Sequence, residues 1–413
     1  MKYYVEGYGC AFNLAETEQI KGLFEKNNFT STAKPSEASI LLVNTCAVKD
    51  TTEKRMLHRL KTLFKEKTPN GKLIAFGCLA ATRQETIQKI SDEIIVLDTD
   101  LESLCKVLEV EVEKFSPKMK KVESKELISI IPISVGCLGS CTYCATKIAR
   151  GDLHSYSIDV INKSFQDALT HSKEIWITSQ DLGCYGFDQN TNLRNLLETL
   201  LKNEGKYFVR LGMMNPNHFL MQHNEIMKIF DDSRVFKFLH IPLQSGSNRI
   251  LKEMNRQYNA EQFVKCVELA RKEVPEITVA TDVIVGFPGE TEKEFEETLD
   301  VLGKIKPDVI NIARYSKRPE TNAAQMQNQL QEGEKKERSK KLTEFRAKLF
   351  NEKNEKMVGK TFEALVSEKK YEGSFIARIS TYRPVVVPEK YGKFVKVKIT
   401  KASTNFFFGK IIK

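Results

Sequence analysis

Residues 136–151 read GCLGSCTYCATKIARG and follow directly on an apolar segment, ISIIPISV, at residues 128–135. The three cysteines of this stretch, Cys137, Cys141 and Cys144, have the spacing CxxxCxxC. Three thiolates in one loop can hold three irons of a 4Fe-4S cluster and leave the fourth iron open to another ligand. The alternative is a zinc loop, but zinc prefers paired CxxC or Cys/His ligands in two knuckles, and the sequence offers no partner pair.

The apolar segment before this loop is the first of six strand-like segments that alternate with helical segments. The other five read EIWIT, YFVRL, FKFLHI, TVATDVIV and DVINIA. Six β/α units in roughly 200 residues favour an incomplete TIM-like (β/α)6 barrel, which we expect over residues 125–350. Each of the six segments ends in polar or glycine-rich residues, and the active sites of such barrels lie at that end.

Residues 1–115 show the same alternation on a smaller scale and predict an N-terminal parallel α/β domain. The strand-like segments read KYYVEGYG, ILLVNT, KLIAFG and EIIVLD, and helical patterns begin near Asn13 and at Asp50. A charged stretch with Pro117, up to about residue 125, is predicted to end a helix and to link this domain to the barrel.

Cys10, Cys46 and Cys78 each follow one of these strand-like segments. Because the carboxyl ends of parallel strands share one edge of a sheet, residues that are distant in sequence can converge there. The alternative is three small apolar side chains that pack near the sheet. Their position beyond the strand ends, and the match with the three cysteines of the other loop, favour a second three-cysteine cluster with an open iron.

The other three cysteines and the histidines are not expected to bind metal. Cys105 and Cys266 lie on apolar helical stripes and are predicted to belong to helix cores. Cys184, in QDLGCYG, follows a barrel strand and is predicted to be structural. The six histidines do not have the spacing of metal ligands.

The composition limits the class of protein. The chain has 413 residues, of which 41% are hydrophobic and 29% charged, which excludes a disordered protein. No apolar run approaches the roughly 18 residues that a membrane span needs, so we expect no membrane association. The N-terminus, MKYYVEGYGC, lacks the apolar core of a signal peptide. Together with the nine cysteines of the chain, this indicates a reducing compartment, and we expect a cytoplasmic location.

The positive charge of the chain is concentrated at its C-terminus. Residues 355–413 carry 13 Lys and Arg against 5 Asp and Glu, a net charge of +8 out of +10 for the whole chain. The segment FVKVKIT alternates apolar residues with Lys396 and Lys398, which predicts a half-buried strand with a basic outer face. After a charged helix at about residues 331–354, about five short strands predict a small antiparallel, OB-like β-barrel over residues 355–413.

With these features in place, the chain resembles the radical S-adenosylmethionine (radical SAM) methylthiotransferases over nearly its whole length. The resemblance rests on GCAFNLAETEQ, NTCAVKDTTEKR and GCLA in the first domain, and on GCLGSCTYC, RLGMMNPNH, HIPLQSGSNRILKEMNRQY and TDVIVGFPGETEKEFEET in the barrel. The C-terminal region resembles a TRAM domain, an RNA-binding module. TSQDLGCYG is similar to the form found in enzymes that act on threonylcarbamoyladenosine at position 37 of tRNA.

The resemblance implies a transferase that converts N6-threonylcarbamoyladenosine in the tRNA anticodon stem-loop to its 2-methylthio derivative by radical C–H to C–S conversion. It implies S-adenosylmethionine and two 4Fe-4S clusters, a radical SAM cluster on Cys137, Cys141 and Cys144 and an auxiliary cluster on the N-terminal triad. The resemblance further implies a reducing electron donor and a sulfur donor as partners. It implies no catalytic side chain, because the clusters and the cofactor carry the chemistry. Two alternatives stay open: an isopentenyladenosine-tRNA or ribosomal-protein methylthiotransferase, and an iron-sulfur RNA-binding redox regulator.

Contacts to the cofactor are expected from strand ends and from the cysteine loop, at Tyr143, Gln180, Gln244, Gly286, Gly289 and Arg314. The two glutamines would contact the ribose or the carboxylate, and the glycines would let the backbone approach the adenine. Arg314 could bind the cofactor's carboxylate bidentately. Alternatively Arg314 or Arg318 reads the substrate's carboxylate, or forms a structural ion pair.

Three further expectations concern charged residues. Arg150 follows the cysteine loop and is expected to stabilise the charge of the radical SAM cluster. Glu320 stands where many members of the family have a glycine, which affects the local turn. RNA contacts are expected on the basic outer face of the C-terminal barrel, near Tyr382 and Tyr391, from Arg378, Lys393, Lys396 and Lys398.

Overall fold

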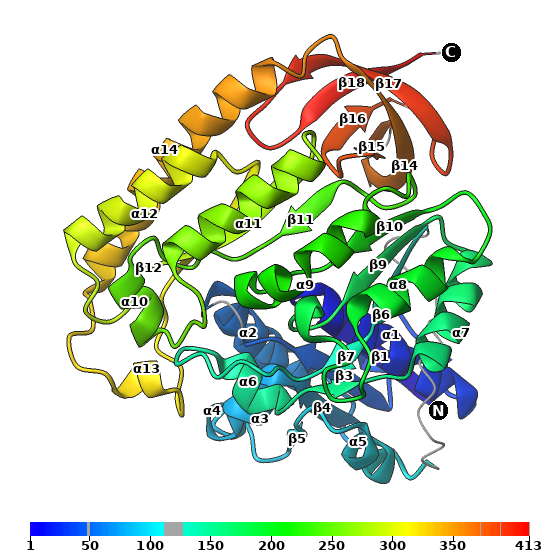
Figure 1. Cartoon of the computed structure of the whole chain (residues 1–413). Helices are drawn as coiled ribbons and strands as arrows, with labels where there is room; N and C mark the ends of the chain where they lie inside the picture. The colour runs from blue at the N-terminus through cyan, green and yellow to red at the C-terminus, as the bar shows by residue number, and fades with distance from the viewer. Residues whose placement is uncertain (48–49, 111–126, 372, 389, 413) are drawn as a thin grey trace.

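The computed structural model describes residues 1–47, 50–110, 127–371, 373–388 and 390–412, which form an N-terminal domain, a central barrel and a C-terminal barrel (Figure 1). The linker predicted around Pro117 lies outside these ranges. Within them, none of the helices combines the length and the apolar character that a membrane crossing requires.

The N-terminal domain is built on a five-stranded sheet in the order β2-β1-β3-β4-β5, in which every pair of neighbours is parallel. This confirms the predicted parallel α/β fold. Its elements are β1 (Lys2–Gly7), α1 (Ala11–Lys26), β2 (Thr30–Ser31), η1 (Pro35–Glu37), β3 (Ile40–Thr45), α2 (Asp50–Glu66), β4 (Lys72–Gly77), α3 (Cys78–Thr82), α4 (Gln84–Gln88), β5 (Ile95–Val96) and α5 (Leu101–Leu108).

The central barrel contains six parallel strands in the order β6-β9-β10-β11-β12-β13. Two three-stranded sheets meet through the parallel bridges Val209–Val235 and Met213–His240. This order confirms the incomplete (β/α)6 barrel. The strands are β6 (Ile128–Pro132), β9 (Glu174–Thr178), β10 (Phe208–Leu211), β11 (Phe238–His240), β12 (Thr278–Val285) and β13 (Val309–Arg314).

The first predicted strand is divided in two. The parallel ladder with β9 ends at Pro132, and β7 (Ser134–Val135) pairs antiparallel with β8 (His154–Ser155). The helical segments are α6 (Ala145–Arg150), α7 (Ile158–Leu169), η2 (Leu182–Cys184), α8 (Leu193–Leu201), α9 (Pro216–Ile229), α10 (Asn248–Glu253), α11 (Ala260–Glu273), α12 (Glu292–Ile305), α13 (Asn322–Gln325) and α14 (Glu332–Glu355).

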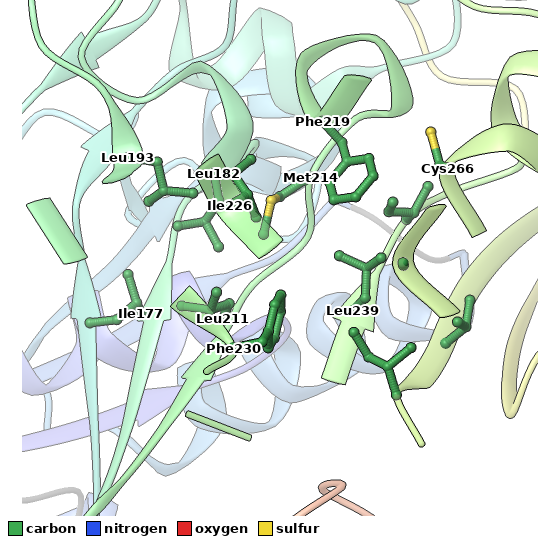
Figure 2. Packing of buried hydrophobic residues seen from close by; sticks show 14 of the residues in the cluster. Ile177, Leu182, Leu193, Leu211, Met214, Phe219, Ile226, Phe230, Leu239 and Cys266 are labelled. Carbon is green, nitrogen blue, oxygen red and sulfur yellow. The ribbon is translucent and has the colours of Figure 1, made fainter. Parts of the chain in front are cut away.

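Apolar side chains from the outer face of the strands pack against the surrounding helices (Figure 2). Ile177, Leu211 and Leu239 come from three neighbouring strands, and Phe219 comes from α9. Cys266 of α11 belongs to the same core, and Cys105 of α5 is also buried. Both predictions of a core cysteine are therefore confirmed.

The C-terminal barrel is closed, in the order β14-β15-β16-β18-β17. Its strands are β14 (Thr361–Tyr371), β15 (Ser374–Ile379), β16 (Pro384–Val387), β17 (Phe394–Ala402) and β18 (Phe407–Ile412). The neighbours are antiparallel except β16 and β18, whose parallel pairing closes the barrel. The predicted OB-like barrel is confirmed with this one exception. As Figure 1 shows, the C-terminal barrel and the N-terminal domain lie on opposite sides of the central barrel.

Candidate active site

The loop between β7 and α6 brings its three cysteines together. Cys144 is the N-cap of α6, and its N–H donates to the carbonyl of Cys141 at 3.1 Å. The N–H of Gly139 donates to the sulfur of Cys137 at 3.3 Å. A Cβ on Gly139 would lie 3.5 Å from the sulfur of Cys137 and 3.8 Å from that of Cys141. The loop therefore wraps around both sulfurs, and a Cβ at position 139 would be in van der Waals contact with each of them.

Arg256 donates from Nη1 to the sulfur of Cys141 at 3.0 Å. Its guanidinium stacks on Tyr258, 4.8 Å from the ring centroid, and Nη2 donates to Asn215 at the start of α9. A positive charge beside a thiolate stabilises the ionised sulfur. We did not predict this arginine from the sequence, although it lies in the quoted segment MNRQY.

Cys184 is fully buried behind this loop. The sulfur of Cys184 lies 3.2 Å from the carbonyl oxygen of Asp181, and when its single thiol proton is donated to Cys137 instead, this hydrogen bond, opposed by burial, lowers the pKa of Cys137 to about 7. The carboxylate of Asp181 is already occupied by His218 and Asn215, each at 2.6 Å. The surroundings fit the structural role predicted for Cys184, and they favour the thiolate form of Cys137.

The cysteines of the N-terminal domain lie at one edge of the sheet. Cys10 is the N-cap of α1, Cys46 follows β3, and Cys78 begins α3 directly after β4. Asn13 joins them: its Oδ1 lies 3.9 Å from the sulfur of Cys10 and 4.0 Å from that of Cys78, while Nδ2 donates to the carbonyl of Thr45 at 2.7 Å. The convergence expected of parallel strand ends is thus present.

Arg150 connects the two cysteine triads. It follows the first triad in α6, yet its Nε donates to the sulfur of Cys78 at 3.2 Å and its Nη2 to Glu16 at 2.8 Å. Ala145 and Ala149 of the same helix pack with Cys78. The expectation that Arg150 serves the cluster of its own loop is therefore wrong. Because α6 packs against α3, the side chain reaches the other triad instead.

Both triads fit iron-sulfur clusters better than single zinc ions. With Zn–S bonds of about 2.3 Å, tetrahedral geometry would draw the sulfurs to about 3.8 Å from one another. Over the described part of the chain, only Asp181, Cys184 and His218 bring three His, Cys, Asp or Glu ligand atoms within 4.8 Å. Neither triad is drawn together that tightly. The spacing and the N–H···S hydrogen bonds suit two clusters with three cysteine ligands each.

Three of the predicted cofactor residues lie in the cysteine loop or beyond the ends of barrel strands. The Oε1 atoms of Gln180 and Gln244, beyond β9 and β11, are buried and have no hydrogen-bond partner within the described part of the chain. Tyr143 turns its ring edge towards Phe287, with 6.4 Å between centroids. Because buried polar atoms are normally paired, the two glutamines have unused capacity for a polar ligand. These residues fit a bound S-adenosylmethionine, and their role stays a prediction.

The other predicted cofactor residues receive less support. A Cβ on Gly286 would lie 2.5 Å from the side chain of Lys335 in α14, so packing against that helix already requires a glycine there. Gly289 adopts φ +74° in the same turn with open space around it. Arg314 is exposed. Because side chains alternate along a strand, Arg314 lies on the same face of β13 as Ile312, which packs against the core between the strands and the helices. The roles of all three stay predictions.

Arg318 is engaged in a structural ion pair. It bonds the carboxylate of Glu53 in α2, and both side chains are at most 10% exposed. Glu53 also pairs with Arg83 at 3.2 Å. Of the roles predicted for Arg318, the structure therefore supports the structural ion pair, which joins the central barrel to the N-terminal domain.

Glu320 adopts φ +65°, in the left-handed region that favours glycine. Replacing it with glycine is expected to raise the free energy of unfolding by about 1 kcal/mol, because the steric cost of a Cβ in this conformation disappears. Urea unfolding, followed by the fluorescence of the chain's one tryptophan, Trp176 in the barrel, measures the change. Glu320→Ala keeps the Cβ and serves as control; an equal gain there would refute the backbone explanation.

The basic outer face of the C-terminal barrel is present, but it is smaller than predicted. Lys393, Lys396 and Lys398 are exposed, while Val397 and Ile399 are buried. The prediction that Arg378 and Tyr382 lie on this face is wrong. Arg378 pairs with Glu368 at 2.7 Å and lies over Tyr382, whose ring packs against Phe236 and Phe238 of the central barrel.

Comparisons with known proteins agree with this arrangement. The sequence models of the uncharacterized protein family UPF0004, the Radical SAM superfamily and the TRAM domain match residues 2–98, 131–302 and 355–412. A radical S-adenosylmethionine methyltransferase from Kitasatospora setae has the same fold, with a TM-score of 0.58 at 11% identity over 78% of this chain and 76% of that one.

Two curated relatives match along almost the entire chain. A probable threonylcarbamoyladenosine tRNA methylthiotransferase of Pyrococcus horikoshii is 37% identical over 100% of both chains. The threonylcarbamoyladenosine tRNA methylthiotransferase of Homo sapiens is 34% identical over 99% of this chain and 73% of its own length. With this coverage and with both cysteine triads in place, the chain belongs to the family of the threonylcarbamoyladenosine tRNA methylthiotransferases.

Proposed function

We propose that this protein converts N6-threonylcarbamoyladenosine at position 37 of tRNA to 2-methylthio-N6-threonylcarbamoyladenosine. The observation that carries the proposal is the packing of two three-cysteine sites against each other through α6 and α3. Carbon 2 of adenine bears an unactivated C–H bond, which no side-chain acid, base or nucleophile can replace by C–S. S-adenosylmethionine and the two clusters, when bound, would supply the radical and the sulfur.

The residues of this chain would hold and tune these groups. Cys137, Cys141 and Cys144 would bind the radical SAM cluster, with Arg256 offsetting its charge. Cys10, Cys46 and Cys78 would bind the auxiliary cluster. We also propose that Tyr143, Gln180 and Gln244 contact the bound S-adenosylmethionine.

The remaining proposals concern domains and partners. We propose bounds of 1–115 for the auxiliary-cluster domain, 125–350 for the radical SAM core and 355–413 for the TRAM domain, in keeping with the segments that the family models match. The anticodon stem-loop is the proposed RNA partner, with a reductant and a sulfur donor as further partners. The tRNA substrates in the names of the relatives support a cytoplasmic site of action.

Nucleoside mass spectrometry of tRNA from cells without this gene tests the function. The expected result is loss of 2-methylthio-N6-threonylcarbamoyladenosine and accumulation of the unmethylthiolated nucleoside. Restoring the gene should restore the product, and the gene with all three cysteines of the α6 loop changed to alanine should not. Loss of a 2-methylthio-isopentenyl nucleoside instead would show that the substrate is wrong, and unchanged tRNA would refute a role in tRNA modification.

Replacing Lys396 and Lys398 with alanine is expected to weaken tRNA binding and to lower the slope of log K against log salt concentration by about 2, because each lysine neutralises about one phosphate. Both side chains are exposed and point away from the core of the C-terminal barrel. Filter binding at several salt concentrations measures the slope. Lys163→Ala with Lys202→Ala removes the same charge from exposed positions on the central barrel. An equal loss in this control would argue against a specific basic face.

A further inference from the structure

A cavity of about 360 Å³ lies between the central barrel and the C-terminal barrel, far from the cysteine triads along the strands. Four arginines line it: Arg210 from β10, Arg346 from α14, and Arg378 and Arg383 from the C-terminal barrel. Among the described residues that line it, Asp308 is the one carboxylate. The cavity is therefore rich in positive charge.

Arg210 is held by aromatic rings. Its guanidinium carbon lies 5.4 Å from the centroid of Trp176, 5.3 Å from that of Phe238 and 5.5 Å from that of Tyr382. Its Nε is buried, with no hydrogen-bond partner among the residues that the structure describes. Stacking on aromatic faces orients a guanidinium and leaves its N–H edge available, which is how arginine presents a fork to an oxyanion.

Tyr382 is positioned for this contact at a conformational cost. It has φ +64°, which is unfavourable for a residue with a Cβ, and it comes from the turn between β15 and β16. Strained residues of this kind persist where the surrounding structure fixes them, and they cluster at ligand sites. The turn carries the tyrosine ring from the C-terminal barrel onto Arg210 of the central barrel.

Two further donors in the cavity are unused. The Nε atoms of Arg346 and Arg378 are also buried without a partner in the described part of the chain. Arg346 otherwise donates to the carbonyl of Ile310, and Arg378 pairs with Glu368 and lies over the ring of Tyr382. Three arginines from three elements thus share the same deficit. Leaving a buried donor without a partner is unfavourable, so the cluster is better explained by a ligand than by packing.

The carboxylates nearby take up the charge of two of the four arginines, since Arg378 also pairs with Glu368 at 2.7 Å. Asp308 is paired with Lys353 at 2.6 Å and Arg383 at 3.4 Å. Asp282, in the interior of the barrel above the cavity, accepts from His240 at 2.9 Å and from Asn311 at 2.8 Å. Among the described residues, the Nε donors of Arg210, Arg346 and Arg378 remain for an external anion.

We propose that this cavity binds a backbone phosphate of the RNA substrate, an inference that rests on the proposed tRNA-modifying function. The substrate's other anion, the threonylcarbamoyl carboxylate, is only four bonds from N6, about 6 Å at most. Ala280 lines the cavity, and it lies five residues, or about 17 Å, before Val285 at the strand end where the cofactor is expected. The carboxylate is too close to the base to reach the cavity, whereas the RNA backbone can.

Arg210→Met tests the proposal, because it keeps the apolar stem between the aromatic rings and removes the charge. Binding of an anticodon stem-loop RNA should weaken about tenfold, with a salt slope lower by about 1. The loss should be the same for RNA with and without the threonylcarbamoyl group. Arg194→Met, on the surface of α8, is the charge-matched control and should bind as the wild type does.

A scan with neutral methylphosphonate linkages identifies the phosphate. At one position the substitution should weaken binding to the wild type about tenfold and binding to the Arg210→Met variant less than about twofold, since the variant has already lost the contact. Circular dichroism and iron content check the fold. If the variant misfolds, Arg346→Met takes its place in the same experiment.

Two results would overturn the proposal. Unchanged affinity and salt slope in the variant would show that the cavity takes no RNA phosphate. A loss confined to threonylcarbamoylated RNA would assign the cavity to the carboxylate instead. Both results can be measured as long as the wild-type protein binds RNA. Failure of the proposed function would instead appear in a different experiment, as unchanged tRNA nucleosides in cells without the gene.

Discussion

Replacing Cys10, Cys46 and Cys78 together with alanine is expected to lower the iron content of the reconstituted protein from about eight to about four atoms per chain. Formation of 5′-deoxyadenosine from S-adenosylmethionine and a reductant should persist, while methylthio transfer to RNA should be lost. The reason is that these cysteines lie at the sheet edge of the N-terminal domain, and the α6 loop carries its own three sulfurs. Iron analysis and product chromatography measure both effects.

Alanine at Cys137, Cys141 and Cys144 should give the reciprocal result. About four irons should again remain, but 5′-deoxyadenosine should no longer form, because the cluster that reduces the cofactor is lost. Cys105→Ala and Cys266→Ala are the controls, since both thiols are buried in helix cores, and they should leave the iron at about eight. If either triad variant kept all its iron, the division of the cysteines into two sites would be refuted.

The strands and the cysteine triads could be predicted from the sequence because both depend on local pattern. An apolar run that ends in Cys10, Cys46 or Cys78 puts the thiol at the carboxyl end of a strand, and parallel pairing brings such ends to one edge. The alternation of Val397 and Ile399 with lysines fixed the basic face of β17 in the same way.

The partners of the charged residues could not be predicted, because they depend on how the domains pack. Arg150 lies next to the α6 loop in sequence, yet it bonds Cys78, which is 72 residues away. Arg378 alternates correctly to the outside of its own barrel, but that outside is covered by the central barrel. Arg256 was missed because its contact to Cys141 spans 115 residues.

Replacing Arg150 with methionine is expected to lower the local stability around α1 and α3 by about 3–5 kcal/mol, the usual cost of breaking a buried ion pair. The side chains of Arg150 and Glu16 are 2% and 5% exposed, so the variant leaves a carboxylate without its cation in a site closed to water. The sulfur of Cys78 loses its charged donor as well. Native-state hydrogen exchange of amides in the two helices measures the change locally.

The double variant Arg150→Met with Glu16→Gln separates charge from packing. Removing both charges should recover most of the lost stability, because an amide is far cheaper to bury than an unpaired carboxylate, and Asn44 already donates to Glu16 at 3.0 Å. A double variant as unstable as the single one would place the damage in lost packing on Phe12 instead. The cluster potential gives a second test: the missing donor to Cys78 should lower the auxiliary cluster's potential in both variants, and more in the single variant, which keeps the negative charge of Glu16 close to that sulfur.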